Sequence, residues 1–361
     1  MDKNIKNEVV KRERFFEMKV EEYFRELDLM EKQYGCEEEL YPFINMFLRN
    51  GKDAKDISIR TVADMTSADT IPGRMLFSAN ISFPDIAILH KDFELTKLNE
   101  SEKKDTGKVL NALIKDFDSN YTKIFGCVEA KQMKYEYFVD LNNENMQKIK
   151  IDTKYLLVLK PQAGNPNYNY TCMLNDCHDF EYDSDAIKWI ISSDKWKKNK
   201  TGRINEIPGI EEVLNNPKRV IEILDRKYIT VGSQSFELDA VNQLFGELFW
   251  YGKVVYTDGL KWKYLEVKKC QNIENQEKAI LFLRKEIYDK CIKKQSALWY
   301  EVIADKDIYI SCQNIANLTE GYNVYKTKNE ITEECDGQWN ELINGLAEKQ
   351  WLPQPEKNNE E

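Results

Sequence analysis

Acidic and basic side chains near the ends of two predicted strands have the types and spacing needed for metal-dependent chemistry. Glu129 and Lys131 close the apolar run 124–131, which predicts a strand. Residues two apart in a strand point to the same face, so this carboxylate and this ammonium project into one site. Asp85 follows Pro84 at the start of another predicted strand, residues 82–89, and adds a second carboxylate.

Two carboxylates suit a hard divalent ion. Mg²⁺ takes one or two of them and keeps several waters, and Mn²⁺ accepts the same kind of ligand. Such an ion lowers the pKa of a bound water and stabilises the charge that grows on a phosphate. We therefore expect Asp85 and Glu129 to hold the metal, and Lys131 to orient the water or neutralise the phosphorus centre, in phosphodiester hydrolysis.

A helix predicted over residues 237–251 adds further polar groups. Gln243, Glu247 and Tyr251 recur there at i, i+4 and i+8, which places all three on one helical face. A hairpin follows, with strands predicted at 253–257 and 262–267 and a turn at Asp258-Gly259. The helix can thus present three polar side chains in one direction just before the chain returns to the sheet.

In this order the segments resemble the PD-(D/E)xK nuclease superfamily. Pro84-Asp85 matches the PD, and Glu129-Ala130-Lys131 matches the (D/E)xK. A helix with glutamine, followed by a strand ending in T-(N/D)-G-x-x-W, is similar to the amino-terminal nuclease domain of type I restriction enzyme motor subunits. That last motif reads Thr257-Asp258-Gly259-Leu260-Lys261-Trp262, and the resemblance covers about residues 36–135 and 236–268.

The resemblance implies a restriction-endonuclease-like fold, which is a mixed central sheet flanked by helices. It also implies a Mg²⁺-dependent endonuclease that acts on DNA in restriction, defence or mobile-element processing. Gln243 would then be a catalytic residue that orients Lys131 or a phosphate. The family places one more acidic residue on its first helix near the metal, and Glu38 and Glu39 are the candidates here.

The chain departs from the family pattern in two respects. The gap between Asp85 and Glu129 is longer than usual, and more than a hundred residues separate Lys131 from the helix of Gln243. The family's tyrosine lies four residues after the glutamine, where this chain has Glu247. Glu247 either replaces that tyrosine or brings an extra carboxylate to the site, and the sequence leaves both readings open.

The amino-acid composition limits the classes of protein to which this chain can belong. The 361 residues are 42% hydrophobic and 12% aromatic, enough for a sizeable core, and no run approaches the ~20 apolar residues of a membrane span. The net charge of −10 argues against binding nucleic acid over the whole surface, although a local basic groove remains compatible with it. Eight scattered cysteines without CxxC, and no apolar signal segment, predict a cytoplasmic protein with reduced thiols.

Hydrophobic periodicity predicts an α/β chain with a sheet core and helices on its faces. The expected parts are an amino-terminal helix at 1–34, a nuclease core at 35–135 and 236–270, an insertion or second lobe at 136–235, an α-rich region at 271–352 and a disordered tail at 353–361. Other helices are expected within 37–49, 99–116, 185–192, 275–294 and 339–351, and other strands at 58–62, 74–80 and 155–159.

A basic cluster inside the insertion is the candidate surface for contacting DNA. Basic side chains interleaved with tryptophans can bind phosphates and stack on bases, and the alternative is a solvated helix end with its loop. The charged members of this cluster are Lys195, Lys197, Lys198, Lys200 and Arg203.

Other functions stay open at this point. A catalytically inactive nuclease fold would bind DNA or a protein partner, and the net charge of −10 favours a protein partner. If the motif match is accidental, the chain is a structural interaction protein. The amino-terminal helix is a candidate homodimer interface, the alternative being that it packs on its own sheet.

Overall fold

The computed structural model describes residues 18–33, 35–62, 76–78, 81–161, 170–174, 197–198 and 219–353. The chain divides into two compact units, one made of Met1–Lys148 with Gln243–Glu361 and the other of Ile149–Asn242. The insertion expected at 136–235 overlaps the second unit. Both motif segments, around Asp85 and Glu129, lie in the first unit together with Gln243.

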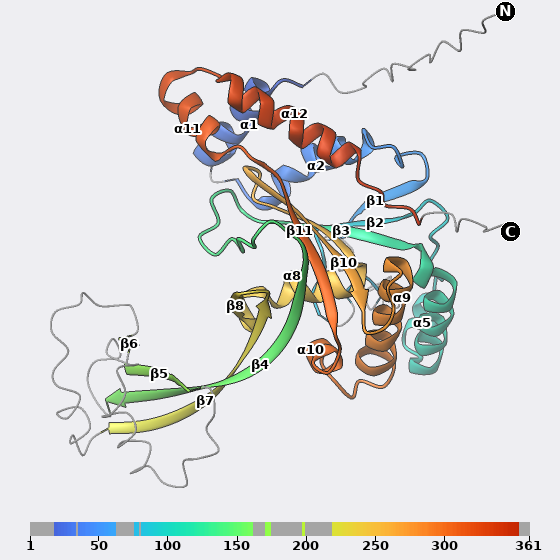
Figure 1. Ribbon diagram of the computed structural model, residues 1–361. Coiled ribbons are helices and arrows are strands. Elements are labelled where there is room, and N and C mark those ends of the chain that lie inside the picture. The colour runs from blue at the N-terminus through green and yellow to red at the C-terminus, as the bar shows by residue number, and fades with distance from the viewer. Residues whose placement is uncertain are drawn as a thin grey trace, which may run out of the picture. The chain divides into compact units, whose positions relative to one another are not determined.

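A mixed β-sheet forms the centre of the first unit (Figure 1). Its strands follow the order β1-β2-β3-β9-β10-β11, and then β4, of which residues 144–148 belong to this unit. The pair β3–β9 is parallel, whereas β1–β2, β2–β3, β9–β10 and β10–β11 are antiparallel. The strands are β1 (Ile57–Thr61), β2 (Ile86–His90), β3 (Ile124–Ala130), β4 (Glu144–Pro161), β9 (Lys253–Thr257), β10 (Lys261–Cys270) and β11 (Ile308–Asn317).

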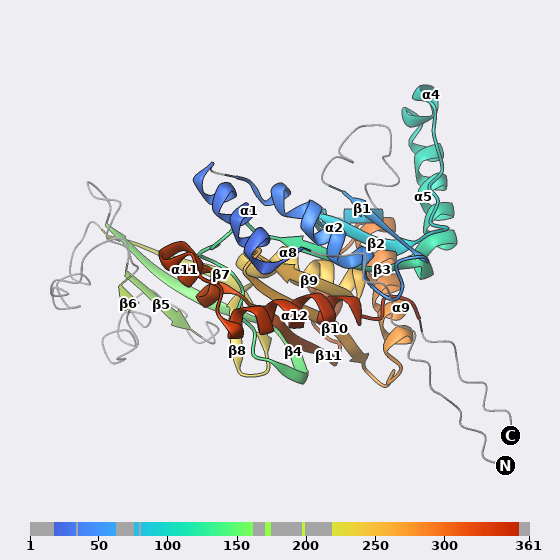
Figure 2. The same cartoon turned by 90° about the horizontal axis from the view of Figure 1, so that it is seen from above.

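Helices cover both faces of this sheet (Figure 1, Figure 2). Figure 1 shows α1, α2, α11 and α12 on one face and α5, α8, α9 and α10 on the other. A parallel pair of strands needs a crossover connection, and α8 enters β9 directly. The helices are α1 (Val20–Lys32), α2 (Tyr41–Arg49), α4 (Glu100–Lys103), α5 (Thr106–Asn120), α8 (Leu238–Tyr251), α9 (Gln276–Ile287), α10 (Trp299–Ile303), α11 (Thr319–Lys328) and α12 (Glu333–Ala347).

Polar side chains fix where several of these helices begin and end. Asn99, Asp105, Asn275 and Thr332 each accept hydrogen bonds from backbone N–H groups in the first turn of α4, α5, α9 and α12. These bonds satisfy donors that have no partner within the helix. Asn329 ends α11 in the left-handed conformation, which asparagine tolerates better than most residues.

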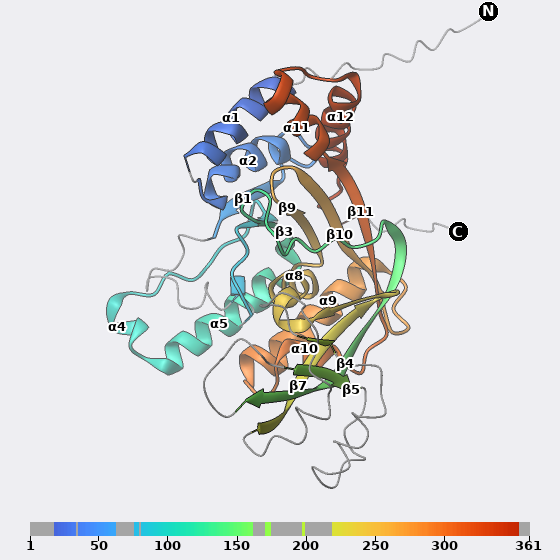
Figure 3. The same ribbon diagram turned by 90° about the vertical axis from the view of Figure 1, so that its left-hand side faces the viewer.

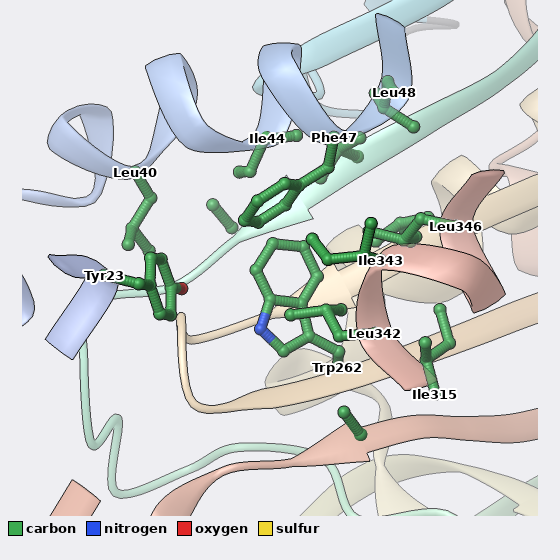
Figure 4. Close-up of a cluster of buried hydrophobic side chains, with 14 of the residues drawn as sticks. Tyr23, Leu40, Ile44, Phe47, Leu48, Trp262, Ile315, Leu342, Ile343 and Leu346 are labelled. Carbon is green, nitrogen blue, oxygen red and sulfur yellow. The ribbon is translucent and has the colours of Figure 1, made fainter. Parts of the chain in front are cut away.

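The core between the sheet and α1, α2 and α12 is built around Trp262 of β10 (Figure 4). The ring of Trp262 lies 5.5 Å from that of Phe47, which in turn lies 5.6 Å from that of Trp339. Tyr23 of α1 packs 5.0 Å from Trp339. Helices from both ends of the chain therefore meet over a hairpin from its middle, and this packing fixes the sheet beneath them.

The second unit contains a long antiparallel ladder. β4 continues into this unit and pairs with β7, and β5 lies along the other side of β4 (Figure 3). β6 pairs with β5, and β8 pairs with β7 after a turn at Gly232, whose φ of 58° suits glycine. The remaining strands are β5 (Tyr170–Leu174), β6 (Lys197–Lys198), β7 (Arg219–Val231) and β8 (Gln234–Glu237).

Several elements expected from the sequence are confirmed. The structure has the helix over 237–251, the hairpin around Asp258-Gly259, and strands at 58–62, 124–131 and 155–159. The segment 37–49 is helical as expected, first as a 3₁₀ turn, η1 (Glu37–Leu40), and then as α2. The expected helix at 185–192 lies outside the described residues.

Three expectations are wrong in part. Leu76–Ser78, within the strand expected at 74–80, is helical, and β2 begins at Ile86 rather than at 82. The region 271–352 is not only helical, because β11 is a ten-residue strand of the central sheet.

No helix in the described part of the chain combines the length and the apolar character needed to cross a bilayer.

Candidate active site

Asp85 is tied to two other elements at the beginning of β2. Its side chain is 8% exposed. The Tyr41 hydroxyl of α2 donates to Oδ1 at 2.6 Å, and the backbone N–H of Ala130 donates to Oδ2 at 2.6 Å. Because Ala130 lies between Glu129 and Lys131, the second bond fixes the Asp85 carboxylate beside the other motif.

Glu129 is a buried carboxylate with one oxygen left without a hydrogen bond. The side chain is 1% exposed, and Oε1 accepts from the Lys131 ammonium, whereas Oε2 has no hydrogen-bond partner. Burial and the charge of Asp85 raise the pKa of Glu129 to about 8, despite the opposing effect of Lys131. A buried carboxylate oxygen without a donor is costly, so this position favours an added proton or cation.

Lys131 joins the sheet to α8. Its backbone N–H donates to the Thr257 carbonyl of β9 at 2.7 Å, which fixes the residue just after β3 ends. Its Nζ donates to Glu129 and, at 3.3 Å, to Oε1 of Gln243. Burial lowers the pKa of Lys131, but the Glu129 carboxylate outweighs burial and the pKa rises above its usual value. The ionised Glu129 carboxylate therefore favours the ammonium form of Lys131.

Gln243 orients its amide between two strand ends. While Oε1 accepts from Lys131, Nε2 donates to the Phe83 carbonyl at 3.5 Å. Phe83 lies two residues before Asp85, so the amide links both motif segments. The structure thus brings together the four residues expected to be catalytic: Asp85, Glu129, Lys131 and Gln243.

Glu247 adds a third carboxyl group deeper in the protein. It is 1% exposed, and it accepts from the Ser82 hydroxyl at 3.0 Å and from the Cys127 thiol at 3.9 Å. Burial, followed by the charges of Glu129 and Asp85, raises the pKa of Glu247 well above its usual value. The extra carboxylate considered from the sequence is therefore close enough to act electrostatically on the two motif carboxylates.

Tyr251, the third residue on this face of α8, points elsewhere. Its hydroxyl donates to the Phe77 carbonyl at 2.9 Å, and the side chain is 1% exposed. The neighbouring Trp250 donates in the same way to the Leu76 carbonyl at 2.8 Å. These two side chains hold the segment Leu76–Ser78 against α8 rather than supplying a group to Asp85 and Glu129.

The acidic residue of the 3₁₀ turn that faces the site is Glu37. Glu38 and Glu39, the residues selected from the sequence, are both exposed, and Glu39 approaches Gly35. Glu37 is half-buried, and burial followed by the charge of Asp85 raises its pKa. Its charge also acts on Glu129 and Lys131. Of the two glutamates expected from the sequence, Glu38 also acts on the site, because its charge raises the pKa of Asp85.

Two tyrosines of the site were missed from the sequence. Tyr41 donates to Asp85, and Tyr256 of β9 lies opposite Glu129 in the register of the parallel pair. Burial raises the pKa of Tyr256 to about 12. No motif marks Tyr41, and Tyr256 could have been noticed because it directly precedes Thr257.

The motif Thr257–Trp262 shapes the hairpin turn. Thr257 Oγ1 accepts from the Gly259 N–H at 2.9 Å, and Asp258 Oδ1 accepts from the Lys261 N–H at 2.7 Å. Gly259 has φ of 84°, a conformation that glycine adopts without strain. The motif therefore positions β9, whose Thr257 carbonyl holds the backbone of Lys131.

The basic cluster expected to contact DNA lies outside the described side chains. Lys197 and Lys198 form β6, whose backbone alone is described, and Lys195, Lys200 and Arg203 fall outside the described residues.

A cavity of about 530 Å³ opens at the end of the sheet where β3 and β9 begin, and it is lined by Ile124 of β3 and Lys253 of β9. Since Glu129 lies at the opposite end of β3, this cavity is separate from the carboxylates.

The residues present fit a hard divalent ion. Among the described residues, no three His, Cys, Asp or Glu side chains stand together as a complete protein-made metal site. Mg²⁺ does not need one, because it takes one or two carboxylates and completes its octahedron with water. Asp85 offers a fixed carboxylate and Glu129 an oxygen that has no donor, and burial raises the pKa of both groups.

No protein-family model matches the chain, and neither a curated protein nor a solved structure is significantly similar to it. The fold itself is α/β, with a mixed sheet flanked by helices.

Proposed function

We propose that this chain is a Mg²⁺-dependent endonuclease that hydrolyses phosphodiester bonds of DNA, with Mn²⁺ as an alternative ion. The observation that carries the proposal is the buried Glu129 Oε2, which lacks any hydrogen-bond donor in a site it shares with Asp85 and Lys131. Three buried carboxyl groups lie around one ammonium there, and burial raises the pKa of each, so a divalent cation would stabilise their ionised forms.

Each residue has a distinct part in the proposed reaction. Asp85 and Glu129 would hold the ion, which lowers the pKa of a bound water and stabilises the charge on the phosphate. Lys131, which keeps its proton, donates hydrogen bonds to the attacking water or to a phosphate oxygen. Gln243 holds the Lys131 ammonium in place through its Oε1, and Tyr41 holds the carboxylate of Asp85.

The arrangement of elements supports the resemblance to PD-(D/E)xK nucleases. Asp85 directly precedes β2, Glu129 lies at the end of β3 with Lys131 just after it, and α8 leads into β9, which pairs in parallel with β3. These elements form one mixed sheet with helices on both faces, as a restriction-endonuclease-like fold requires. The resemblance further implies a role in restriction, defence or mobile-element DNA processing, which we include in the proposal.

A plasmid-nicking assay with the full chain tests the proposal. The parent should convert supercoiled DNA to nicked or linear forms with Mg²⁺ or Mn²⁺ and not with EDTA. Asp85→Asn and Lys131→Ala should each lower the rate at least about a hundredfold, because each removes charge stabilisation from the reaction. Asp118→Asn, at an exposed position of α5, is the matched control and should cut like the parent.

Two results would overturn the proposal. Cleavage that persists in both Asp85→Asn and Lys131→Ala would exclude this site as its source. A parent that binds no Mn²⁺ tightly and cuts neither DNA nor RNA would instead favour a catalytically inactive nuclease fold that binds DNA or a protein partner, and the net charge of −10 favours the protein partner.

A further inference from the structure

An exposed aromatic pair lies in the loop that directly follows the catalytic lysine. Tyr135 and Tyr137 are 40% and 66% exposed, and their rings lie 5.8 Å apart in an edge-to-face arrangement. Most aromatic side chains of the first unit are buried; Tyr137 is the most exposed large hydrophobic side chain among the described residues. Both rings are thus open to a ligand only a few residues after Lys131.

The loop holds the two tyrosines on a fixed base. Phe138 stacks on Tyr256 with ring centres 4.4 Å apart, and the Val139 N–H donates to the Tyr256 hydroxyl at 3.4 Å. Within the loop, the Tyr135 N–H donates to the Gln132 carbonyl at 3.0 Å, and the Phe138 N–H donates to the Tyr135 carbonyl at 3.2 Å. Two consecutive turns are thereby closed over a ring that belongs to the site.

Contacts outside the loop anchor both of its ends. At the start, Lys134 pairs with Glu31 of α1 at 2.8 Å. At the end, Leu141 is 2% exposed and its carbonyl accepts from the Lys263 ammonium at 2.9 Å. The tyrosines are therefore presented outward by a backbone that is already ordered, which reduces the entropy lost when a ligand covers them.

The aromatic pair lies within reach of a strand whose phosphate occupies the site. Tyr135 is four residues after Lys131, so their Cα atoms are at most about 14 Å apart. That span corresponds to about four stacked nucleotides at 3.4 Å per step. The hydroxyl of Tyr135 also acts electrostatically on Tyr256, which pairs with Glu129 across β3 and β9.

We propose that Tyr135 and Tyr137 stack on unpaired bases of a single-stranded DNA segment adjoining the bond to be cut. The inference rests on the proposed function in that it takes the phosphodiester to lie at Lys131. Every base has a face that can stack on a tyrosine, whereas paired bases keep their faces within the duplex. Stacking also supplies affinity that does not depend on charge, which an acidic chain with a net charge of −10 needs.

Binding of fluorescein-labelled oligothymidylate to the full chain, measured by anisotropy in EDTA, tests this inference without any cleavage. The double variant Tyr135→Leu/Tyr137→Leu keeps apolar side chains but removes both rings, and it should bind at least about tenfold more weakly. The double variant Tyr135→Phe/Tyr137→Phe keeps the rings and should bind like the parent. Tyr309→Leu, on β11, is the matched control and should also bind like the parent.

The outcomes separate this inference from the proposed function. Equal affinity of the parent and the leucine double variant, or an equal loss in the phenylalanine double variant, would overturn the stacking role even if the parent cuts DNA. A parent that does not bind oligothymidylate would overturn it too. If the parent binds with the expected ring dependence but cuts neither plasmid nor oligothymidylate with Mg²⁺ or Mn²⁺, the assignment as a DNA nuclease fails and the single-strand surface stands.

Discussion

Replacing Tyr41 by phenylalanine removes a single hydroxyl from the buried side of the candidate active site. That hydroxyl donates to Asp85 Oδ1 at 2.6 Å, and the two side chains are 6% and 8% exposed. In the variant, Oδ1 loses this donor, while the bond from the Ala130 N–H to Oδ2 remains. The change isolates the hydrogen bond because the aromatic ring and its packing stay in place.

The expected loss of stability depends on whether the acceptor of the hydrogen bond is charged. A hydrogen bond to a charged group contributes about 1.5–3 kcal/mol, against about 1 kcal/mol for a neutral pair. We expect Tyr41→Phe to lower the free energy of unfolding by about 2 kcal/mol, or about thirtyfold in the unfolding equilibrium. Tyr23→Phe is the matched control, since the Tyr23 hydroxyl donates at the same 2.6 Å to a neutral acceptor, the Gly259 carbonyl. It should cost about 1 kcal/mol.

Urea unfolding followed by tryptophan fluorescence measures these differences. The five tryptophans that report on the first unit are all buried, so their emission follows the unfolding of this unit: Trp250, Trp262, Trp299, Trp339 and Trp351. Adding Asp85→Ala and the double variant Tyr41→Phe/Asp85→Ala completes a double-mutant cycle. We expect a coupling energy of about 1.5–3 kcal/mol between the two side chains.

Two results would refute this reasoning. A coupling energy below about 0.5 kcal/mol would mean that the two substitutions act independently. A cost for Tyr23→Phe as large as that for Tyr41→Phe would mean that the charge of Asp85 adds nothing, and the carboxylate would then have to be neutral in the folded protein at the pH of the measurement.

Three further predictions concern the metal, a surface carboxylate and two glycines. Mn²⁺ at a hundred times its dissociation constant should stabilise the parent by about 2.7 kcal/mol and leave the stability of Asp85→Asn unchanged. Thermal unfolding measures both, and equal shifts of the two unfolding temperatures would mean that the ion binds elsewhere. Although burial acts against it, hydrogen bonds from two lysines and a tyrosine lower the pKa of Glu31 to about 2, so its stabilisation is present above about pH 4.5 and is lost as the pH falls towards 2. Glu31→Gln should thus cost about 1 kcal/mol at pH 7 and nothing at pH 2, in unfolding curves at both pH values; a cost independent of pH would contradict this. Gly252→Ala should destabilise the protein by at least about 2 kcal/mol, because φ is 83° and a Cβ would lie 2.6 Å from Ile280. Gly337→Ala, where a Cβ would meet nothing within 4 Å, should stabilise α12 by up to about 1 kcal/mol. Urea midpoints in the reverse order would contradict the geometry.

Of the contacts among the four catalytic candidates, only the one between Glu129 and Lys131 could be predicted from a short-range rule. Glu129 and Lys131 share a strand face by spacing alone, and Lys131 reaches Glu129 in the structure. Asp85 and Gln243 were expected beside them only from the resemblance to a known family. Their contacts with Ala130 and Lys131 span long separations in the sequence, which spacing alone does not predict.

Spacing in the sequence could not predict which of three adjacent glutamates points towards the site. Glu37, Glu38 and Glu39 are identical in type and lie in one short 3₁₀ turn, where a shift of one residue turns a side chain through about a third of a revolution. Which of them faces Asp85 depends on how Leu40, which is 1% exposed, enters the core. That packing involves α1 and Gly259, which are distant in the sequence.

Tertiary contacts also explain the elements that were wrongly predicted. Leu76–Ser78 lies in a short apolar run, and periodicity does not distinguish a strand from a helical turn in so few residues. Its carbonyls accept from Trp250 and Tyr251 of α8 rather than from a neighbouring strand. β11 was overlooked although it pairs with β10 along nearly its whole length, between segments that are helical.

The parallel pairing of β3 with β9 has a consequence for biosynthesis. Lys131 leaves the ribosome early, yet the carbonyl that holds its backbone belongs to Thr257, and Tyr23 packs against Trp339. Closing contacts over such separations is slow and must wait for the later partner to be translated. A nascent or prematurely terminated polypeptide that ends before β9 thus lacks the strand that holds the backbone of Lys131, and the candidate site forms only when translation is well advanced.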